Sequence, residues 1–346
     1  MDINNLDNFD SDRQWQSFLE ELKKAASLDE RKVLSMEASE WLEGAEDDTC
    51  RFVVDSNFLN NQRYLNRHLI FVNQKMQMGG IFICAFFSAE ERSALLRKRY
   101  PKTFRFHYLM DFFWHRACPK LFLTRRFYFS IYKQVKRVYP VPEVLGRLSF
   151  CGFDILHSEV IDKATVVVCR KRGLPSTDEH PSYNLLISLR RIGKNGKWFN
   201  VYKLRTMYAY SEYLQQYVYE KCALDKEGKF ANDFRISGWG RRLRKYWLDE
   251  LPMLWNILKG DMKIVGVRPL SEQYYSLYTP EMQQLRITAK PGLLPPYYVD
   301  MPEGIEEVQE SERKYIEAFN AHPLRTQWTY FWKIIYSILI KRHHSH

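Results

Sequence analysis

The sequence lacks the features that mark exported, zinc-binding and membrane-spanning proteins. Its six cysteines are scattered singly, with no CxxC pair and no zinc-like spacing to histidine, so we expect buried thiols in a reducing compartment. The opening residues, MDINNLDNFD, are acidic and polar where a signal peptide is basic and then apolar. No run of about 18 apolar residues occurs, since Ile81–Phe87 is too short and Trp328–Ile340 contains Lys333. These absences argue against export and against a conventional transmembrane helix.

The composition is that of a folded protein that attracts anions. The 346 residues are 45% hydrophobic and 15% aromatic, and 52 Lys and Arg against 41 Asp and Glu give a net charge of +11. A chain of this length predicts about two domains. A basic surface suits nucleic acid, an acidic membrane leaflet or a phosphorylated substrate, and composition alone does not choose among them.

The first 172 residues predict an α/β domain. Trp15–Leu22 has the apolar spacing of an amphipathic helix. A helix through Leu69 and Val72 is expected to stop at Gly79-Gly80, where glycine can adopt a left-handed cap, and Ile81–Phe87 is expected to follow as a buried strand. Ser88 and Glu91 form a capping box that opens the next helix.

The end of this domain predicts one more helix and a hairpin. Pro142–Phe150 is the helix, and Phe153–Ile161 pairs with Thr165–Arg170. The order of elements resembles the C-terminal half of a class I methyltransferase fold, but the glycine-rich turn that holds the cofactor in such enzymes is absent. We therefore interpret residues 1–172 as a non-catalytic scaffold or partner surface.

A polar stretch at residues 173–184 is the predicted linker, and residues 185–346 form the second predicted domain. It opens with a β-hairpin in which Leu185–Leu189 and Trp198–Leu204 flank the turn signal Asn195-Gly196. Strand alternation places Lys203 and Arg205 on one face.

The candidate chemical centre is a pair of adjacent acids. We expect Asp249 to cap a helix that carries Glu250 and Pro252 in its first turn and ends at Gly260. The positive end of that helix would lower the proton affinity of the Asp249 carboxylate and favour a bound phosphate. Taken alone, such a pair is more often only a cap.

Adjacent acids can divide the work of phosphoryl transfer. One carboxylate attacks phosphorus to give an acyl phosphate while its neighbour holds Mg²⁺ against diphosphate oxygens. The charge on the transferred group requires a clamp of basic side chains. The candidates for that clamp are Lys203, Arg205, Arg235, Arg244 and Arg268.

The second domain resembles the monotopic phosphoglycosyl transferases, the bacterial sugar transferases that initiate surface glycan assembly. The motifs that carry the resemblance are YKLRTM at Tyr202–Met207, DFRISGWGRRLRK at Asp233–Lys245, LDELPMLWNILKGDM at Leu248–Met262, GVRP at Gly266–Pro269 and KPGL at Lys290–Leu293. They follow the family's order from Leu185 onward.

The resemblance implies an α+β catalytic domain that transfers a sugar 1-phosphate from a UDP-sugar to a polyprenyl phosphate and releases UMP. By position, Asp249 matches the nucleophile and Glu250 the acid that binds Mg²⁺. The five basic residues named above match motif positions that contact phosphates. The implied product initiates a capsular polysaccharide, exopolysaccharide or other glycan, on the cytoplasmic face of the membrane, with other glycan-assembly proteins as possible partners.

The chain departs from the family at several positions. The apolar segment that dips into the membrane just before the basic strand is missing, since Cys169–Asn184 is short and polar. Val267 replaces a proline, Leu294–Tyr297 replaces a Thr-Gly-Trp type sequence, and Gln327 stands where an Asp is expected. These departures leave a soluble transferase with another phosphorylated acceptor as one alternative, and an inactive scaffold for glycan-assembly enzymes as another.

The C-terminal tail from Trp328 is rich in Trp, Tyr and Phe and ends in a basic cluster. Such a helix either lies in the lipid headgroup layer or packs on the domain core. No DNA- or RNA-binding module is recognised, so nucleic acid is not expected as a partner. We assign no role to the terminal histidines.

Overall fold

The computed structural model describes most of the chain as two compact units. The described residues are 33–35, 46–55, 57–119, 122–131, 137–161, 163–178, 181, 184–215, 217–218, 233–302 and 304–340. The first unit holds those up to Pro181 together with Ala209–Val218, and the second holds the others. The predicted helix at Trp15–Leu22 and the terminal histidines lie outside these residues. Within them, no helix combines the length and the apolar character needed to cross a bilayer.

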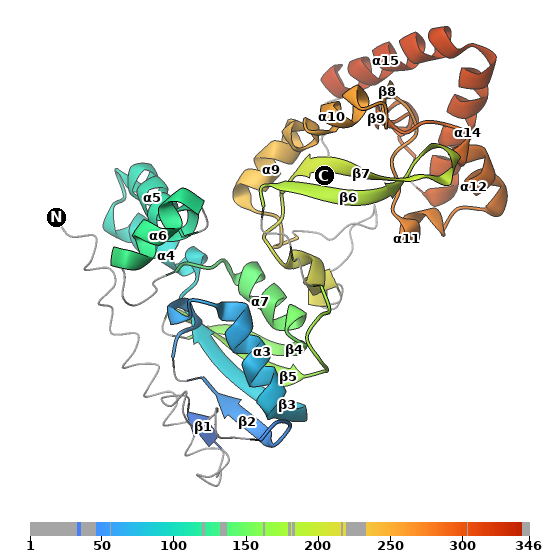
Figure 1. The fold of residues 1–346 in the computed structure, drawn as a ribbon. Helices are drawn as coiled ribbons and strands as arrows, with labels where there is room; N and C mark the ends of the chain where they lie inside the picture. The colour runs from blue at the N-terminus through green and yellow to red at the C-terminus, as the bar shows by residue number, and fades with distance from the viewer. Residues whose placement is uncertain are drawn as a thin grey trace. The chain divides into compact units, whose positions relative to one another are not determined.

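The first unit is built on a mixed five-stranded sheet of order β1-β2-β3-β5-β4 (Figure 1). Its strands are β1 (Val33–Ser35), β2 (Cys50–Val54), β3 (Met76–Phe86), β4 (Phe153–Ile161) and β5 (Ala164–Lys171). The first three run parallel, and β5 is antiparallel to both β3 and β4. The predicted α/β class and the β4–β5 hairpin are confirmed. In β3, Phe82–Phe86 is buried without interruption, so both faces of this central strand are covered.

The glycine pair at Gly79-Gly80 does not cap a helix, and that prediction is wrong. Helix α3 (Leu65–Lys75) already ends at Lys75 because Met76 adopts an extended conformation. Both glycines lie inside β3, where pairing with β2 jumps from Cys50↔Met76 to Phe52↔Ile81. Gly79 has φ +75°, so the pair forms a β-bulge that only glycine tolerates easily.

The capping signal at Ser88 is confirmed. Ser88 Oγ accepts a hydrogen bond from the Glu91 amide (3.1 Å) and caps α4 (Ala89–Arg99). The next elements are α5 (Phe104–Phe112), a single π-helical stretch (Phe113–Ala117) and α6 (Phe122–Ile131), followed by α7 (Val141–Phe150). Helix α7 matches its predicted range within one residue. Of the cysteines in the described chain, four are buried and Cys50 is half-buried, all as free thiols.

The segment Ala209–Val218, which follows the strand carrying Lys203 in sequence, packs in the first unit against α7. Tyr210 is fully buried there with φ +63°, next to the 3-10 turn Ser211–Leu214. The Arg147 guanidinium stacks 4.4 Å above the Tyr210 ring, and the Tyr210 hydroxyl accepts a hydrogen bond from Asn66 (2.6 Å). A Cβ on Gly146 would lie 2.3 Å from the Tyr210 carbonyl oxygen, so glycine is required for this close approach.

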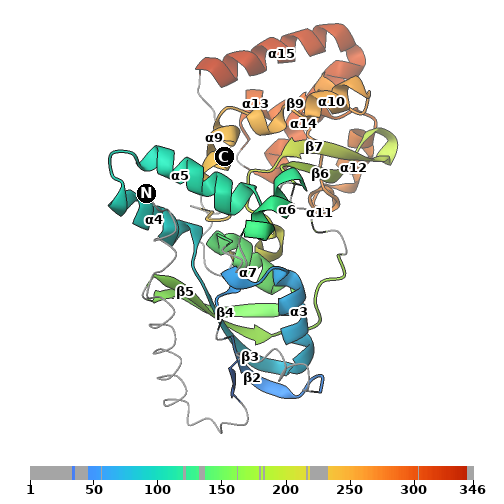
Figure 2. The ribbon, with the colours of Figure 1, turned by 60° about the vertical axis from the view of Figure 1, so that its left-hand side comes forward.

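The second unit opens with the predicted antiparallel hairpin of β6 (Leu186–Ile192) and β7 (Trp198–Leu204). Asn195 and Gly196 form its turn with φ of 57° and 69°. A short parallel pair, β8 (Lys263–Val265) and β9 (Gly292–Leu294), lies further along the chain. The helices are α9 (Gly238–Lys245), α10 (Met253–Leu258), α11 (Glu272–Tyr275), α12 (Pro280–Ile287), α13 (Tyr297–Asp300), α14 (Ile305–Ala321) and α15 (Pro323–Ile340). Figure 2 shows β6 and β7 surrounded by these helices within the unit.

The core of the second unit gathers around β8, α12, α14 and α15. Val265, Met282, Tyr315 and Ile334 are buried there with no more than 1% exposed surface. Helix α15 contributes one face to this core through Ile334 and its neighbours. This agrees with one of the two interpretations of the tail, that it packs on the domain core. Its other face carries Leu324, Trp328, Trp332 and Tyr336, which are all more than half exposed and recur every fourth residue.

Candidate functional site

Strand β7 and helix α10 are fastened to each other by one buried amide. Asn256 has no exposed surface; its Oδ1 accepts from the Tyr202 amide (3.1 Å) and its Nδ2 donates to the Asn200 carbonyl (2.7 Å). Both bonds join α10 to the backbone of β7. Because the acid pair comes just before α10, this amide sets its position relative to Lys203. Asn256 belongs to the motif Leu248–Met262, but nothing in the sequence of that motif indicated that it joins α10 to β7.

The acid pair does not cap a helix as predicted. Leu248–Glu250 forms a separate 3-10 turn that begins after Trp247, whose φ is +52°. Helix α10 starts only at Met253, with Pro252 as its N-cap, and is six residues long. Asp249 therefore lies ahead of the helix, and the expected help from the helix dipole does not apply to its carboxylate.

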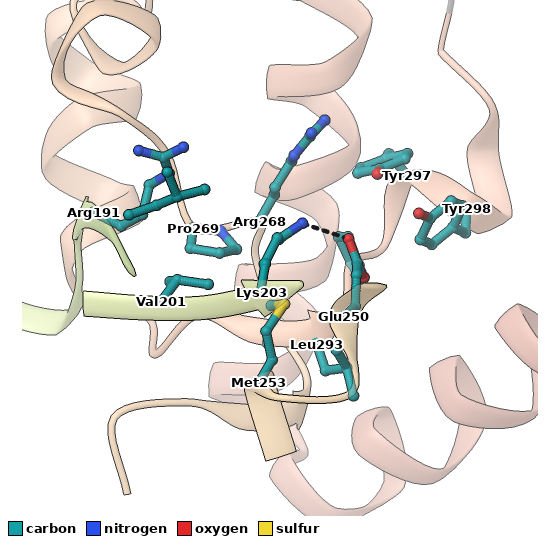
Figure 3. Close-up of a pocket in the computed structure, with 13 residues that line it drawn as sticks. Arg191, Val201, Lys203, Glu250, Met253, Arg268, Pro269, Leu293, Tyr297 and Tyr298 are labelled. Carbon is teal, nitrogen blue, oxygen red and sulfur yellow. Dashed lines mark hydrogen bonds and ion pairs between the residues drawn. The ribbon is translucent and has the colours of Figure 1, made fainter. Parts of the chain in front are cut away.

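Lys203 and Glu250 point toward one another across a cavity, and their side chains form an ion pair of 2.6 Å (Figure 3). Arg268 lines the same cavity, whose walls combine β6, β7, the acid-bearing turn and the segments around β9 and α13. The lining residues are Leu189, Arg191, Val201, Lys203, Glu250, Met253, Arg268, Pro269, Gly292, Leu293, Pro295, Tyr297 and Tyr298. Three cations and one carboxylate on these walls suit an anionic ligand.

Asp249 is buried beside this cavity with only 7% of its surface exposed, and its Oδ1 has no hydrogen-bond partner. Burial raises the pKa of the Asp249 carboxyl, and the charge of Glu250 raises it further, while Lys203 and Arg244 oppose the shift. This direction is opposite to the one predicted from the helix dipole. Desolvation dominates because Oδ1 lacks the hydrogen bond that would compensate for lost water.

Polar contacts within the motif Asp233–Lys245 connect α9 to Thr206 and bring Arg244 close to Asp249. Ser237 caps α9 by accepting from the Gly240 amide (3.0 Å) and donates to the Thr206 carbonyl (2.9 Å). Arg244 Nε donates to Thr206 Oγ1 (2.9 Å), and this guanidinium is close enough to Asp249 to stabilise its negative charge. A Cβ on Gly240 would lie 2.0 Å from the Thr206 carbonyl oxygen, which explains the glycine.

Not all five predicted cations meet at one point. Lys203 and Arg268 line the cavity and Arg244 is close to Asp249. Arg235 is 4% exposed and its charge is neutralised by Asp233 through two-pronged hydrogen bonds, the shortest 2.7 Å. Arg205 Nε donates to the Asn184 carbonyl (3.0 Å), and Arg205 is not among the residues that line the cavity.

Three of the cavity residues with polar side chains were not predicted. Arg191 lies on β6, whose pairing with β7 places it on the face that carries Lys203, so strand alternation could have identified it. Tyr297 and Tyr298 belong to α13, and the Tyr298 hydroxyl accepts from Trp247 Nε1 (3.2 Å). That contact joins positions 51 residues apart; no local pattern encodes it.

A resident metal would have few protein ligands here. Among the residues that the structure describes, no group of three or more His, Cys, Asp or Glu side chains converges on one point. The Glu250 carboxylate at the cavity and the unpaired Oδ1 of Asp249 are the acidic oxygens available. Mg²⁺ commonly binds through one or two carboxylates, with substrate phosphates and water completing its shell, so this pair fits such an ion.

Comparison with known proteins finds relatives for the second unit. A sequence model described as "Bacterial sugar transferase" matches residues 175–339. The undecaprenyl-phosphate galactose phosphotransferase of Salmonella typhimurium is 36% identical over 135 residues, which cover 38% of this chain and 28% of that protein. A UDP-glucose:undecaprenyl-phosphate glucose-1-phosphate transferase of Caulobacter vibrioides is 36% identical over 157 residues, covering 44% and 54%.

Further relatives extend the same picture. Galactosyl transferase CpsE of Streptococcus agalactiae is 27% identical over 218 residues, covering 63% of this chain and 43% of that protein. The chain thus spans between about a quarter and about half of these relatives. A SAM-dependent methyltransferase structure from Methanosarcina mazei covers 38% of this chain and 63% of its own, at 17% identity and a TM-score of 0.26, too low to support a shared fold. The methyltransferase-like arrangement of the first unit therefore stays a prediction, whereas residues 175–339 match the bacterial sugar transferase family.

Proposed function

We propose that the protein transfers a sugar 1-phosphate from a UDP-sugar to a polyprenyl phosphate, releasing UMP, as the first step in assembling an exopolysaccharide, capsule or similar glycan. The observation that carries the proposal is the buried Asp249 carboxylate next to a cavity lined by Glu250, Lys203 and Arg268. The name of the Caulobacter relative contains both a UDP-sugar donor and undecaprenyl phosphate, and the name of the Salmonella relative contains undecaprenyl phosphate, which supports the proposal.

The proposed reaction has two displacements at one phosphorus atom. The Asp249 carboxylate attacks the phosphorus that bears the sugar, the bond from this phosphorus to the bridging oxygen breaks, and UMP leaves with that oxygen. An oxygen of the polyprenyl phosphate then attacks the same phosphorus and breaks its bond to Asp249. The products are a polyprenyl diphosphosugar and the regenerated carboxylate. Asp249 Oδ1 suits this role because it has no hydrogen bond that must be broken before it attacks.

Cations around Asp249 would hold the donor. Lys203 and Arg268 line the cavity and suit the diphosphate oxygens, while Arg244 stabilises the ionised form of the nucleophile. Arg205 and Arg235 stay candidates for phosphate contacts, but each would first have to leave its present partner, the Asn184 carbonyl or Asp233. Glu250 would hold Mg²⁺ when it is bound, and the ion would neutralise charge on the diphosphate. Lys203, which now pairs with Glu250, would then be released toward the phosphates.

The proposed acceptor is a lipid, so the protein would work at the inner face of the cytoplasmic membrane as a peripheral protein. The exposed stripe of α15 formed by Leu324, Trp328, Trp332 and Tyr336 supports this location. Aromatic side chains on one face of a helix favour the headgroup layer. A flotation assay on liposomes with the stripe replaced by serine tests it, and unchanged flotation would end the idea of an anchor in α15.

The test of the function is Mg²⁺-dependent UMP release from a panel of UDP-sugars with detergent-solubilised undecaprenyl phosphate. Wild type, Asp249→Asn and a matched Asp261→Asn control are compared. Release that needs the lipid, vanishes in Asp249→Asn and persists in the control supports the proposal. Release with water-soluble phosphorylated acceptors instead would favour a soluble transferase, and no release with any sugar would favour the inactive scaffold.

A further inference from the structure

Helix α5 of the first unit is an apolar helix that buries none of its residues. Its sequence, FRFHYLMDF, would normally place a stripe in a core. Here Phe106 and Leu109 are about two-thirds exposed, and the exposure continues through the π-helical stretch and α6, where Leu123 is 88% and Phe127 60% exposed. The exposed apolar residues of this region are Phe106, Tyr108, Leu109, Met110, Phe112, Phe113, Leu123, Phe127 and Ile131. We refer to the described residues of this region, Phe104–Ala117 and Phe122–Ile131, as the aromatic hairpin.

The aromatic hairpin is folded despite this exposure. Tyr128 and His115 are buried within it, and the Tyr128 hydroxyl lies 3.4 Å from His115 Nδ1. The Trp114 ring makes edge contacts with Phe127 and Tyr128. Figures 1 and 2 show α5 and α6 grouped with α4 beside the five-stranded sheet. An inner set of side chains therefore fixes the outer set in place, and the exposed outer set presents apolar surface that calls for a partner.

Positive charge surrounds this surface. From Arg97 to Ile131 the sequence contains nine Lys and Arg residues and a single acidic residue, Asp111. Asp111 forms an ion pair with the buried Arg92, and Arg92 Nη2 lies 2.7 Å from the Asp111 carboxylate. No carboxylate of this stretch is thus left to oppose its cations. Exposed basic side chains include Arg97, Lys98, Arg99, Lys102, Arg105 and Arg126. The surface therefore selects an anionic partner.

A lipid surface fits this combination better than nucleic acid. Leu109, Met110, Leu123 and Ile131 are aliphatic and exposed, and such side chains enter an acyl layer but do not stack on bases. The helices are also too short to cross a bilayer: α5 and its π-helical extension have nine and five residues and α6 has ten, against about 20 for a spanning helix. Their geometry suits lying in the headgroup layer.

We infer that the aromatic hairpin is a membrane-docking element that places exposed Phe, Leu and Met side chains at the acyl boundary while Arg105, Arg126 and their neighbours bind anionic lipid headgroups. This assigns a role to the first unit, which the proposed reaction does not use. The inference does not depend on catalysis, since it concerns binding to a bilayer that contains neither substrate.

The test measures partitioning of the full chain onto vesicles of phosphatidylcholine alone and vesicles with added phosphatidylglycerol. We expect binding to the anionic vesicles only. Leu109→Ser with Leu123→Ser, and separately Arg105→Ser with Arg126→Ser, should each lower the partition coefficient by more than about tenfold, since each buried apolar group or lipid-facing cation contributes on the order of 1 kcal/mol. Leu174 and Arg170 are exposed residues of the same unit outside the hairpin. The control variants Leu174→Ser and Arg170→Ser should therefore bind the anionic vesicles as the wild-type protein does.

A second measurement needs no substitution. Hydrogen exchange of the wild-type protein should slow in Phe104–Ile131 when anionic vesicles are added, with β4 and β5 unchanged. Unaltered partitioning of both hairpin variants, or no protection in the hairpin, would overturn the inference. If the variants instead lose binding to single-stranded RNA while vesicle binding is intact, the surface is a nucleic-acid site and the membrane assignment is wrong. UMP release, assayed in detergent, reports on the proposed reaction separately.

Discussion

Lys203 Nζ lies 2.6 Å from Glu250 Oε1, so one member of the adjacent acid pair is neutralised while the other, Asp249, is left with a buried oxygen that has no hydrogen-bond partner. The two neighbouring carboxylates therefore differ in environment. The paired one faces Lys203 at the cavity, and the unpaired one carries the penalty of desolvation. Such a division is what separate roles as cation ligand and nucleophile require.

The unpaired carboxylate predicts that Asp249→Asn stabilises the fold. Because the pKa of Asp249 is raised in the folded state, the folded protein binds its proton more tightly than the unfolded chain does, and stability falls as pH rises through the interval between the two values. At neutral pH the full penalty is present. We expect the melting temperature of the variant to exceed that of wild type by a few degrees at pH 7, with the gain shrinking as pH falls through the raised pKa of the folded state and lost below about pH 4.

Thermal melts across this pH range check the prediction. Glu306→Gln, an exposed acid-to-amide change on α14, serves as the control and should shift the melting temperature little at any pH. A variant less stable than wild type at pH 7 would show that Asp249 gains a stabilising interaction in solution.

The ion pair between Lys203 and Glu250 predicts that substitutions of these two residues have non-additive effects on the free energy of unfolding. Both side chains are about one-fifth exposed, so we expect a coupling energy of about 1 kcal/mol in a double-mutant cycle of Lys203→Met and Glu250→Gln, measured by urea denaturation. The same cycle on Lys259 and Asp261, whose charged atoms are 3.9 Å apart at a more exposed position, should give a value near zero. Equal couplings in the two cycles would contradict the structural difference.

A buried pair behind the cavity predicts the largest loss of stability. Glu312 is fully buried, binds Arg286 Nε (2.7 Å), and the two side chains also contact the Arg268 backbone. Glu312→Gln leaves the Arg286 charge uncompensated and should lower the free energy of unfolding by about 3–5 kcal/mol. The apolar double variant Arg286→Met with Glu312→Leu should recover much of that loss in urea denaturation.

The matched control is Glu310→Gln, two positions earlier on α14, whose contacts to Arg313 and Lys314 are 3.8 and 3.7 Å long and exposed. It should change stability by less than about 0.5 kcal/mol. Similar losses for the two substitutions would mean that the buried pair is solvated in the native state.

Alanine substitutions of Gly240 and Gly238, two glycines of the motif Asp233–Lys245, should have opposite effects on stability. A Cβ at Gly240 would collide with the Thr206 carbonyl, whereas a Cβ at Gly238 meets nothing within 4 Å. Gly240→Ala should therefore destabilise the second unit by about 1–3 kcal/mol and reduce UMP release by displacing α9 and Arg244. Gly238→Ala should be neutral or slightly stabilising, since alanine restricts the unfolded chain. Equal effects in thermal melts would show that α9 moves freely away from Thr206.

Local signals in the sequence predicted much of the fold. The Asn195-Gly196 turn identified the β6–β7 hairpin, and Ser88 with Glu91 identified the start of α4, because each signal acts within a few residues. Gly79-Gly80 misled because a positive φ serves a β-bulge as well as a helix cap. Deciding between the two requires the register with β2, a contact between segments distant in sequence.

The environment of the acid pair could not be predicted for the same reason. The motif identified Asp249 and Glu250, but the direction of the pKa shift depends on whether tertiary contacts supply hydrogen bonds to Asp249, and here they do not. Tyr298 joins the cavity through Trp247, and Arg235 is neutralised by Asp233. A basic residue in a motif can thus be a phosphate ligand or an internal counterion, and only the packed structure distinguishes them.

The docking of Ala209–Val218 on α7 bears on how this chain can be divided. A fragment that starts at Ser182 would keep Tyr210, Leu214 and Val218, which have no exposed surface in the whole chain, but would lose Arg147 and Asn66, which hold Tyr210. In such a fragment, the segment Ala209–Val218 after β7 would expose these apolar side chains to water. The two units are therefore not interchangeable modules: exchanging the first for an unrelated one, by recombination or by engineering, must also replace the loop or recreate its close contact with Gly146.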